Sequence, residues 1–313
     1  KMRAEGTYHT KIYPILCSVL DHDNILKTLK KHKVDTLYHA AAYKHVPLLE
    51  VNPLEAIRNN VLGMSILCSA TIKARVAKFI LISSDKAVRP KNIMGATKRI
   101  AELICIAKND NNHNTKFLFV RFGNVIGSSG SVIPLFQEQI NDGGPITITD
   151  ENITRYFMTT TEAAELVIQA GAMANGNDFF VLDMGEPIRI LDIAKNMARI
   201  NGLNPVIVQN TKLKDTVSKK GSGYIDINIT GLRLGEKLHE ELFLDHEPKK
   251  SKHPKIYRGT EEPILADDLD ALLDQLKCAL ETFNTTAALE ALDNPHVNYS
   301  PSSTNKPVRN LCT

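Results

Sequence analysis

The chain has 313 residues, of which 43% are hydrophobic and 23% are charged, and this composition is typical of a folded soluble protein rather than a disordered or fibrous one. The 38 Lys and Arg residues and the 35 Asp and Glu residues leave a formal net charge of +3 without a long basic run, so no nucleic-acid partner is expected. The apolar runs fall far short of the roughly 20 residues of a membrane helix and no signal peptide opens the sequence, so we expect no membrane segment in this chain.

Short apolar runs alternate with helix-like segments through the first part of the chain. We expect, in order, a strand at Ile12–Val19, a helix at Asn24–Lys33, a strand at Thr36–His39, a helix at Pro53–Ala74, a strand at Lys78–Ser83, a helix at Gly95–Lys108 and a strand at Lys116–Arg121. This alternation predicts a parallel sheet with crossover helices. The strands are apolar on both faces, as is typical when helices cover each side of a sheet.

The composition and the predicted element lengths change near residue 125. Beyond Ile126, Gly and Pro become frequent, the strands at Ile146–Thr149 and Phe179–Leu182 are short, and helices are expected at Thr161–Met173 and Ile190–Ile200. We therefore predict an α/β fold, a Rossmann-like doubly wound parallel sheet with a smaller α/β substrate lobe. The expected units are a truncated dinucleotide-binding domain (1–125), the substrate lobe (126–265), a C-terminal helical segment (266–298) and a flexible tail (299–313), with a mobile polar insertion at Lys212–Gly223.

A dinucleotide-binding sheet of this kind opens with a G-x-G-x-x-G turn, and no such turn occurs near the start of the sequence. The Gly-rich run Gly127–Ser131 follows a late strand and is not that fingerprint. We expect that the first βαβ unit is missing. In the usual strand order, Ile12–Val19 would then lack its neighbours, and it should lie detached from the main sheet or be paired elsewhere.

Polar side chains follow two of the predicted strands at the edge of the sheet where ligands bind. Small residues, Ala40, Ala41 and Ala42, end the strand Thr36–His39; they would let a flat cofactor lie against the backbone, although such alanines often only pack under a helix. Ser84, Asp85 and Lys86 end the next strand. An adjacent Asp and Lys can be a solvated turn, but Met94 and Lys98, one turn apart on the following helix, point back at the same edge and favour a site.

Seven ordered segments carry a resemblance to a known family: Tyr38–Pro47, Asn59–Gly63, Ser83–Val88, Met94–Lys98, Phe122–Val125, Thr154–Met158 and Gly231–Lys237. Together they resemble the UDP-N-acetylhexosamine 4,6-dehydratases of bacterial polysaccharide biosynthesis, which are extended short-chain dehydrogenase/reductases. The sequence departs from that family by lacking the Gly-rich fingerprint and by having Leu234 in place of the usual Pro. Met94 stands where most of the superfamily has Tyr, which is similar to the longer, retaining branch of the dehydratases.

The resemblance implies an enzyme with bound NAD or NADP that converts UDP-N-acetylglucosamine to a UDP-4-keto-6-deoxy-N-acetylhexosamine for surface glycan synthesis. In such chemistry the cofactor oxidises carbon 4, a base removes the proton on carbon 5, and an acid protonates the departing 6-hydroxyl. By resemblance, Lys98 orients the cofactor ribose, and Asp85 and Lys86 are the candidate acid and base. Because Met94 cannot ionise, the proton of the 4-hydroxyl would leave through Ser84, Asp85 or a water.

The same resemblance assigns residues to the two ligands. Arg155 and Arg233 are expected to clamp the diphosphate, as guanidinium groups bind phosphate oxygens bidentately. Asn124 and Glu236 are expected to contact substrate, and the cofactor set comprises Asp21, Ala40, Ala41, Ala42, Lys44, Asn60 and Lys98. Asp21 also fits an N-cap of the helix Asn24–Lys33, and His39 and His45 are interpreted as structural.

Two rival functions remain open at this point. A 4-epimerase of the same superfamily would keep the ketone chemistry, but it needs no acid at the 6-hydroxyl, so the Asp85–Lys86 pair argues against it. A non-catalytic fragment is the other, because the phosphate cradle is absent from the sequence. The five scattered cysteines favour a cytoplasmic location without a metal or disulfide site. By resemblance, a homo-oligomer is also expected, and relatives of the longer branch often carry a membrane region.

Overall fold

The computed structural model describes residues 11–109, 114–128, 130–174, 179–209, 223–243, 249–259, 261 and 264–301. Its main sheet has the strand order β1-β2-β3-β8-β13-β12. The strands are β1 (Thr36–His39), β2 (Lys78–Ile82), β3 (Lys116–Arg121), β8 (Phe179–Leu182), β13 (Ile256–Gly259) and β12 (Lys249–Lys250). Pairing from β1 through β8 is parallel, whereas β13 and β12 run antiparallel to their neighbours. The predicted α/β class and parallel sheet are confirmed.

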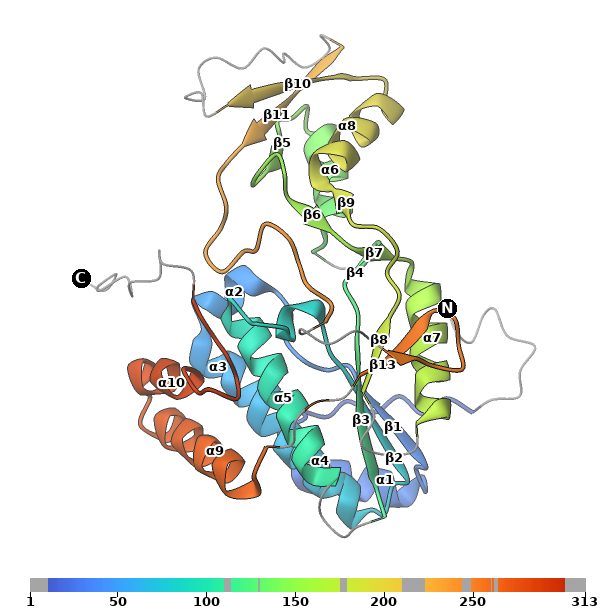
Figure 1. Cartoon of the computed structure of the whole chain (residues 1–313), viewed down its shortest axis with the longest axis vertical. Coiled ribbons are helices and arrows are strands. Elements are labelled where there is room, and N and C mark those ends of the chain that lie inside the picture. Colours follow the sequence, from blue (N-terminus) through green and yellow to red (C-terminus); the bar gives the residue numbers. More distant parts are fainter. Residues whose placement is uncertain are drawn as a thin grey trace.

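The central strands β2, β3 and β8 are buried on both faces, as their continuous apolar runs predict, whereas β1 and β12 are more exposed. Along β2, Phe79 and Leu81 belong to the core that contains helix α5 (Ile93–Asn109), whereas Ile80 belongs to the opposite core against helix α7 (Thr160–Met173). This alternation follows from the two-residue period of a strand. Figure 1 shows α5 and α7 on opposite sides of the main sheet.

Helices cover the main sheet and continue through the small lobe. Their bounds are α1 (His22–Lys31), α2 (Val46–Glu50), α3 (Pro53–Ile57), α4 (Gly63–Lys73), α5 (Ile93–Asn109), α6 (Val132–Asn141), α7 (Thr160–Met173), α8 (Ile190–Ile200), α9 (Ala266–Glu281) and α10 (Thr285–Leu292). A π-helical turn, Arg58–Leu62, joins α3 to α4, so the predicted helix Pro53–Ala74 is nearly continuous. None of the helices in these described ranges is long and apolar enough to cross a membrane.

The segment Ile12–Val19 is not a strand, which corrects the sequence interpretation. Its apolar side chains do not enter the sheet: half of Ile15 and all of Leu16 are exposed. Among the described strands, β1 pairs with β2 alone, so no strand lies beside β1 to receive this segment. The expectation that Ile12–Val19 would be detached from the main sheet is met.

A small lobe lies beyond the carboxyl ends of the main strands (Figure 1). Its parallel sheet has the order β10-β11-β5, with β10 (Asn204–Gln209), β11 (Tyr224–Ile229) and β5 (Ile146–Ile148). Strands β11 and β5 share a core with α6 and α8. Two short ribbons lie between this sheet and the main one: β4 (Asn124–Val125) with β7 (Phe157–Met158), and β6 (Thr154–Arg155) with β9 (Ile188–Arg189).

The chain passes between the main sheet and the small lobe more than once. Strands β8 and β13 return to the main sheet, although both fall in the range 126–265 that was expected to form the substrate lobe. Strand pairing between distant segments is not visible in local sequence patterns, so the interval was wrongly taken as one contiguous unit. The expected polar insertion lies almost entirely outside the described residues, as does most of the tail from 299 to 313.

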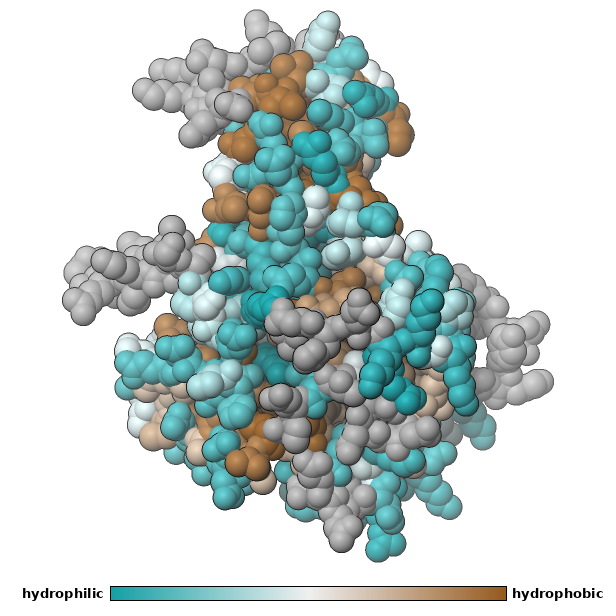
Figure 2. Space-filling view, viewed as in Figure 1, coloured by the Kyte–Doolittle hydropathy of each residue, from teal (hydrophilic) through white to brown (hydrophobic). Residues whose placement is uncertain are grey.

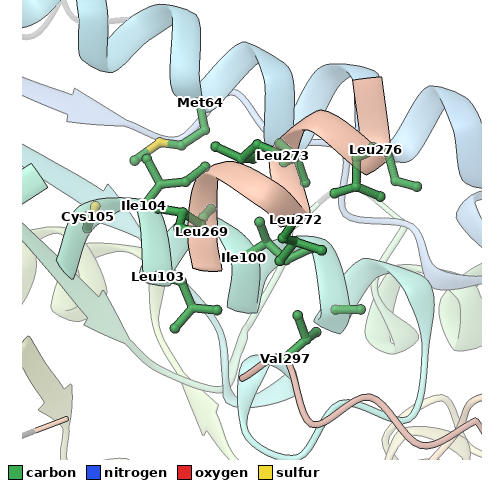
Figure 3. Packing of buried hydrophobic residues seen from close by; sticks show 14 of the residues in the cluster. Met64, Ile100, Leu103, Ile104, Cys105, Leu269, Leu272, Leu273, Leu276 and Val297 are labelled. Carbon is green, nitrogen blue, oxygen red and sulfur yellow. The ribbon is translucent and has the colours of Figure 1, made fainter. Parts of the chain in front are cut away.

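The C-terminal helices complete the core on the α5 side of the sheet. Figure 3 shows Leu269, Leu272, Leu273 and Leu276 of α9 in one apolar cluster with Ile100 of α5 and Met64 of α4. Each of these leucines is at most 8% exposed. The expected helical segment 266–298 therefore packs on the main domain as α9 and α10.

Candidate active site

The carboxyl ends of the main strands and the two ribbons enclose a cavity of about 470 Å³. Eleven of the residues expected at the site line it: Ala40, Ala42, Lys44, Ser84, Lys86, Met94, Lys98, Asn124, Arg155, Arg233 and Glu236. Figure 2 shows hydrophilic residues across much of the narrow waist between the lobes on the face in view. The prediction that these side chains meet at the carboxyl edge of the sheet is consistent with this arrangement.

A tight turn places the Asp85–Lys86 pair over the start of α5. Ser84 caps a 3-10 turn at Asp85–Ala87, and its hydroxyl accepts a hydrogen bond from the Lys86 amide at 3.3 Å. Gly95 makes this contact with α5 feasible, because a Cβ there would lie 2.2 Å from the Lys86 carbonyl oxygen. Gly95 is therefore required by the close packing of the turn on the helix, and its neighbour Met94 lines the cavity.

Lys86 faces the cavity, and Asp85 lies buried behind it. The Lys86 Nζ is 3.0 Å from Asp85 Oδ1 and 3.4 Å from both Asn124 Oδ1 and Glu240 Oε1. Burial opposes the charge on Lys86, but Asp85 and Glu240 outweigh it, so the pKa of Lys86 is raised above its usual value. Lys86 is therefore a stable ammonium at neutral pH.

The carboxylate of Asp85 does not itself line the cavity, although it was expected among the reacting groups. Its Oδ1 accepts hydrogen bonds from Ser84 and Lys86, and its buried Oδ2 has no hydrogen-bond partner in the described part of the chain. Gly123 lines the cavity and lies between the cavity and Asp85 Oδ2, since a Cβ on Gly123 would be 3.3 Å from that oxygen. The absent side chain at Gly123 leaves the oxygen close to the cavity wall.

Lys98 is a buried ammonium on the same wall. Its Nζ donates a hydrogen bond to the carbonyl oxygen of Ile82 at 2.8 Å. Burial lowers the pKa of Lys98 to about 8, although Glu102 acts in the opposite direction. Burial, together with the charge of Lys98, also lowers the pKa of His39 to about 4, so His39 is neutral at physiological pH. This state agrees with a structural rather than a titrating role for His39.

Asn60 holds the loop after β1 from behind and does not line the cavity. Its Oδ1 accepts from the Tyr43 amide at 2.8 Å, and its Nδ2 donates to the Tyr43 carbonyl and to Thr97 Oγ1, each at 3.0 Å. The neighbouring Asn59 donates to the Ala41 carbonyl at 3.3 Å. The π-helical turn therefore fixes the segment that carries Ala40, Ala42 and Lys44 rather than contacting a ligand there.

Asp21 lies apart from the cavity. Its carboxylate accepts from the backbone amide of Asn24 at 3.1 Å and from the Asn24 side chain at 2.8 Å, and it is the N-cap of α1. These hydrogen bonds lower the pKa of Asp21. Of the two readings of Asp21, the structure shows the N-cap and not a contact with the cavity.

Arg155 lines the cavity, and its buried guanidinium is shared between two carboxylates. Its Nη2 lies 3.3 Å from Glu236 Oε1, and its Nε lies 3.9 Å from Glu240 Oε1. Glu236 also accepts from the Arg233 amide at 3.1 Å, and Arg233 itself is exposed at the cavity wall. The two arginines therefore present one anchored and one solvent-facing guanidinium.

Residues outside the expected set also belong to this site. Glu240 is fully enclosed, with 3% of its side chain exposed, and it contacts Lys86 and Arg155. It lies three residues after Lys237, where the last of the family segments ends, and no spacing rule marks it. His45 lines the cavity against Gly130, whose φ of +68° and proximity to the His45 ring exclude a side chain.

Comparison with known proteins places the chain among proteins of polysaccharide synthesis. Residues 1–261 match the family described as Polysaccharide biosynthesis protein. The chain is 46% identical over 273 residues to the Capsular polysaccharide biosynthesis protein CapD of Staphylococcus aureus, covering 86% of this chain and 43% of CapD. It is 47% identical over 253 residues to the Probable polysaccharide biosynthesis protein EpsC of Bacillus subtilis (strain 168), covering 80% of this chain and 39% of EpsC. The chain thus spans about two-fifths of the length of each relative.

A solved structure shares the architecture. The X-ray structure of Pen from Bacillus thuringiensis aligns with a TM-score of 0.68 at 30% sequence identity, covering 85% of this chain and 83% of that chain. The shared fold extends over the main sheet and the small lobe, because only a match through both could cover so much of each chain.

Proposed function

The chain belongs to the polysaccharide biosynthesis protein family, and we propose that its site is that of an NAD(P)-dependent 4,6-dehydratase. The substrate would be UDP-N-acetylglucosamine and the product a UDP-4-keto-6-deoxy-N-acetylhexosamine for a surface polysaccharide. The observation that carries the proposal is the Asp85–Lys86 pair, held at 3.0 Å in a cavity that is also lined by Met94, Lys98, Arg155 and Arg233. A sugar nucleotide needs both kinds of group, because its sugar would react at the Asp85–Lys86 pair and its diphosphate would bind the arginines.

The cavity fits the reactive end of a nicotinamide cofactor. Ala40 and Ala42 present little more than backbone at the end of β1, and Lys98 supplies a buried ammonium next to them. These residues would hold the nicotinamide and its ribose, and Asn60 would fix the loop that contains the alanines. When bound, the cofactor supplies reversible hydride transfer, so that the sugar loses water without net oxidation.

The chain's own residues account for the proton transfers. Lys86 faces the cavity as an ammonium, so it can donate a proton to the departing 6-hydroxyl, which reverses the order in which the resemblance makes Asp85 the acid and Lys86 the base. Asp85, behind Gly123, is the carboxylate available to accept the proton of carbon 5, and its Oδ2 has no other partner in the described residues. The Ser84 hydroxyl, which lines the cavity and donates to Asp85 Oδ1 at 2.8 Å, would pass the 4-hydroxyl proton on to solvent, so that the Asp85 carboxylate is free for the proton of carbon 5.

Arg155 and Arg233 support the assignment of the diphosphate end. Arg155 is anchored by Glu236 and by the carbonyl of Thr154 at 2.7 Å, so its guanidinium keeps one orientation. Arg233 is exposed and can close on the phosphates, while its amide is fixed by Glu236. Charge-assisted bonds of this kind bind phosphate with both strength and direction.

Mass spectrometry of the reaction mixture tests the proposal. The protein is incubated with UDP-N-acetylglucosamine and NAD⁺, and the nucleotide sugars are weighed. A product lighter by one water supports the dehydratase. A new isomer of unchanged mass would instead identify a 4-epimerase, and substrate that stays unchanged while the protein remains folded would identify a non-catalytic fragment.

The location is proposed on separate grounds. We propose that the protein works in the cytoplasm, where UDP-sugars are available and thiols stay reduced. Cys17, Cys68, Cys105 and Cys278 are free thiols in the structure, which supports a reducing compartment.

A further inference from the structure

One oxygen of Glu240 lies between two cations of the cavity wall. Glu240 Oε1 is 3.4 Å from Lys86 Nζ and 3.9 Å from Arg155 Nε. We infer that Glu240 is a positioning residue that couples Lys86, the proposed proton donor, to Arg155, the proposed phosphate ligand. This inference rests on the proposed function for the roles of the two cations.

The electrostatics require a carboxylate at this point. Lys86 is faced by three charged groups: Asp85 on its own turn, Glu240, and Arg155 on β6. Arg155 disfavours the charge on Lys86, and Glu240 opposes that effect. In a buried site two like charges repel strongly unless an opposite charge lies between them. Glu240 therefore lets two cations line the same wall.

Glu240 acts from behind the wall rather than on the substrate. It does not line the cavity, only 3% of its side chain is exposed, and Lys86 and Arg155 lie on its cavity side. Its second oxygen, Oε2, is buried without a hydrogen-bond partner in the described part of the chain. An incompletely satisfied buried carboxylate is costly, so its presence needs a reason other than packing. Holding two functional cations in place provides one.

The test follows the protonation of Lys86 by NMR. Protein with isotope-labelled lysine is titrated with base, and the Lys86 signal is assigned by its loss in Lys86→Arg. In Glu240→Gln, which keeps the size of the side chain, the onset of Lys86 deprotonation should move to lower pH, because one of its two stabilising carboxylates is gone. Glu240→Asp keeps the charge and should leave the onset between those of the other two proteins.

Glu241→Gln is the matched control. Glu241 is next in the chain and half-exposed, and it pairs with Arg89 and Lys237. Its replacement should leave the Lys86 onset unchanged. An identical onset in wild type, Glu240→Gln and Glu240→Asp would overturn the inference, whereas a loosened fold alone would not shift one lysine in this order.

The titration needs no turnover, so it separates two failures. A protein that dehydrates the sugar but shows no shift in Glu240→Gln contradicts this inference alone. A protein that shows the shift but never releases water contradicts the proposed function and leaves the coupling of Lys86 to Glu240 in place.

Discussion

The Lys86 ammonium faces the cavity at 3.0 Å from Asp85, and the carboxylate is enclosed behind it. This order gives the two residues different tasks: the lysine reaches the substrate directly, while the aspartate depends on the gap at Gly123. The sequence predicts the pair and its edge of the sheet, because both follow a buried strand. It does not predict which member faces the cavity, since that depends on the turn packed against α5.

Replacing either member of the pair should stop the chemistry and spare binding. In Lys86→Ala and in Asp85→Asn we expect dehydration to fall by about 10²–10⁴, the usual cost of losing a general acid or base. UDP affinity, measured by calorimetry, should stay close to wild type because the phosphate end is intact. Lys91→Ala, which lies outside the cavity lining, is the control, and near-normal turnover in both variants of the pair would refute the assignment.

Lys98 should set the basic limb of the pH profile. Its pKa is lowered to about 8, so its positive charge is present below that pH and is lost as pH rises through it. If the charged form orients the cofactor, kcat/KM should fall above about pH 8. In Lys98→Arg the guanidinium stays charged, and this fall should vanish even if the rate is lower. The pKa of Lys86 is raised above its usual value, so Lys86 does not account for a fall near pH 8. A profile that keeps its inflection near pH 8 in Lys98→Arg would show that the inflection belongs to another group.

At the scale of elements, the π-helical turn Arg58–Leu62 determines the shape of the cofactor end. It directs Asn60 toward the backbone of Tyr43 on both its donor and acceptor sides. A resemblance places Asn60 near the cofactor, but only the structure shows that it acts through the loop. Similarly, the N-cap signal at Asp21 was readable from sequence, whereas its distance from the cavity depends on how α1 packs against α4.

Removing the Asn60 side chain should loosen that loop. In Asn60→Ala the Tyr43 amide and carbonyl lose partners in a partly buried site, and we expect a loss of about 1–3 kcal/mol in unfolding free energy. In calorimetric titrations, the affinity of the variant for NAD⁺ should fall below that of wild type, and this loss should exceed the loss of affinity for UDP. Asn52→Ala removes an exposed hydrogen bond to Leu48 and is the control. Equal behaviour of the two variants would show that Asn60 does not hold the loop.

Across the whole molecule, local sequence patterns predict the individual strands better than they predict how those strands pair in the sheet. Strands β2 and β3 are recognisable as apolar runs because each is buried on both faces, and the shorter run of β1 is recognisable although this strand is partly exposed. Strand β8 was also identified, but its place in the main sheet was not, since pairing of β3 with β8 joins segments about sixty residues apart. Ile12–Val19 was misread because an apolar run becomes a strand only when a partner strand is present.

The C-terminal helices should contribute to the stability of the main domain. Leu276 of α9 is fully buried in the core shared with α5. Leu276→Ala should reduce the free energy of unfolding by about 2–5 kcal/mol, measured by chemical denaturation. Asp274→Ala, on an exposed part of the same helix, should change it little. If the two variants unfold alike, α9 is not part of the cooperative core. The expected homo-oligomer stays a prediction.

The central claim is that this cavity removes water across carbons 5 and 6 of the sugar, and solvent deuterium reports it most directly. The reaction is run in D₂O with UDP-N-acetylglucosamine and NAD⁺, and the product is read by mass spectrometry and NMR. We predict a product that has lost one water and gained one deuterium, at carbon 5, because that proton passes to a base and is replaced from solvent while the hydrogen of carbon 4 returns to carbon 6. A product of unchanged composition, or one without deuterium at carbon 5, would contradict the account.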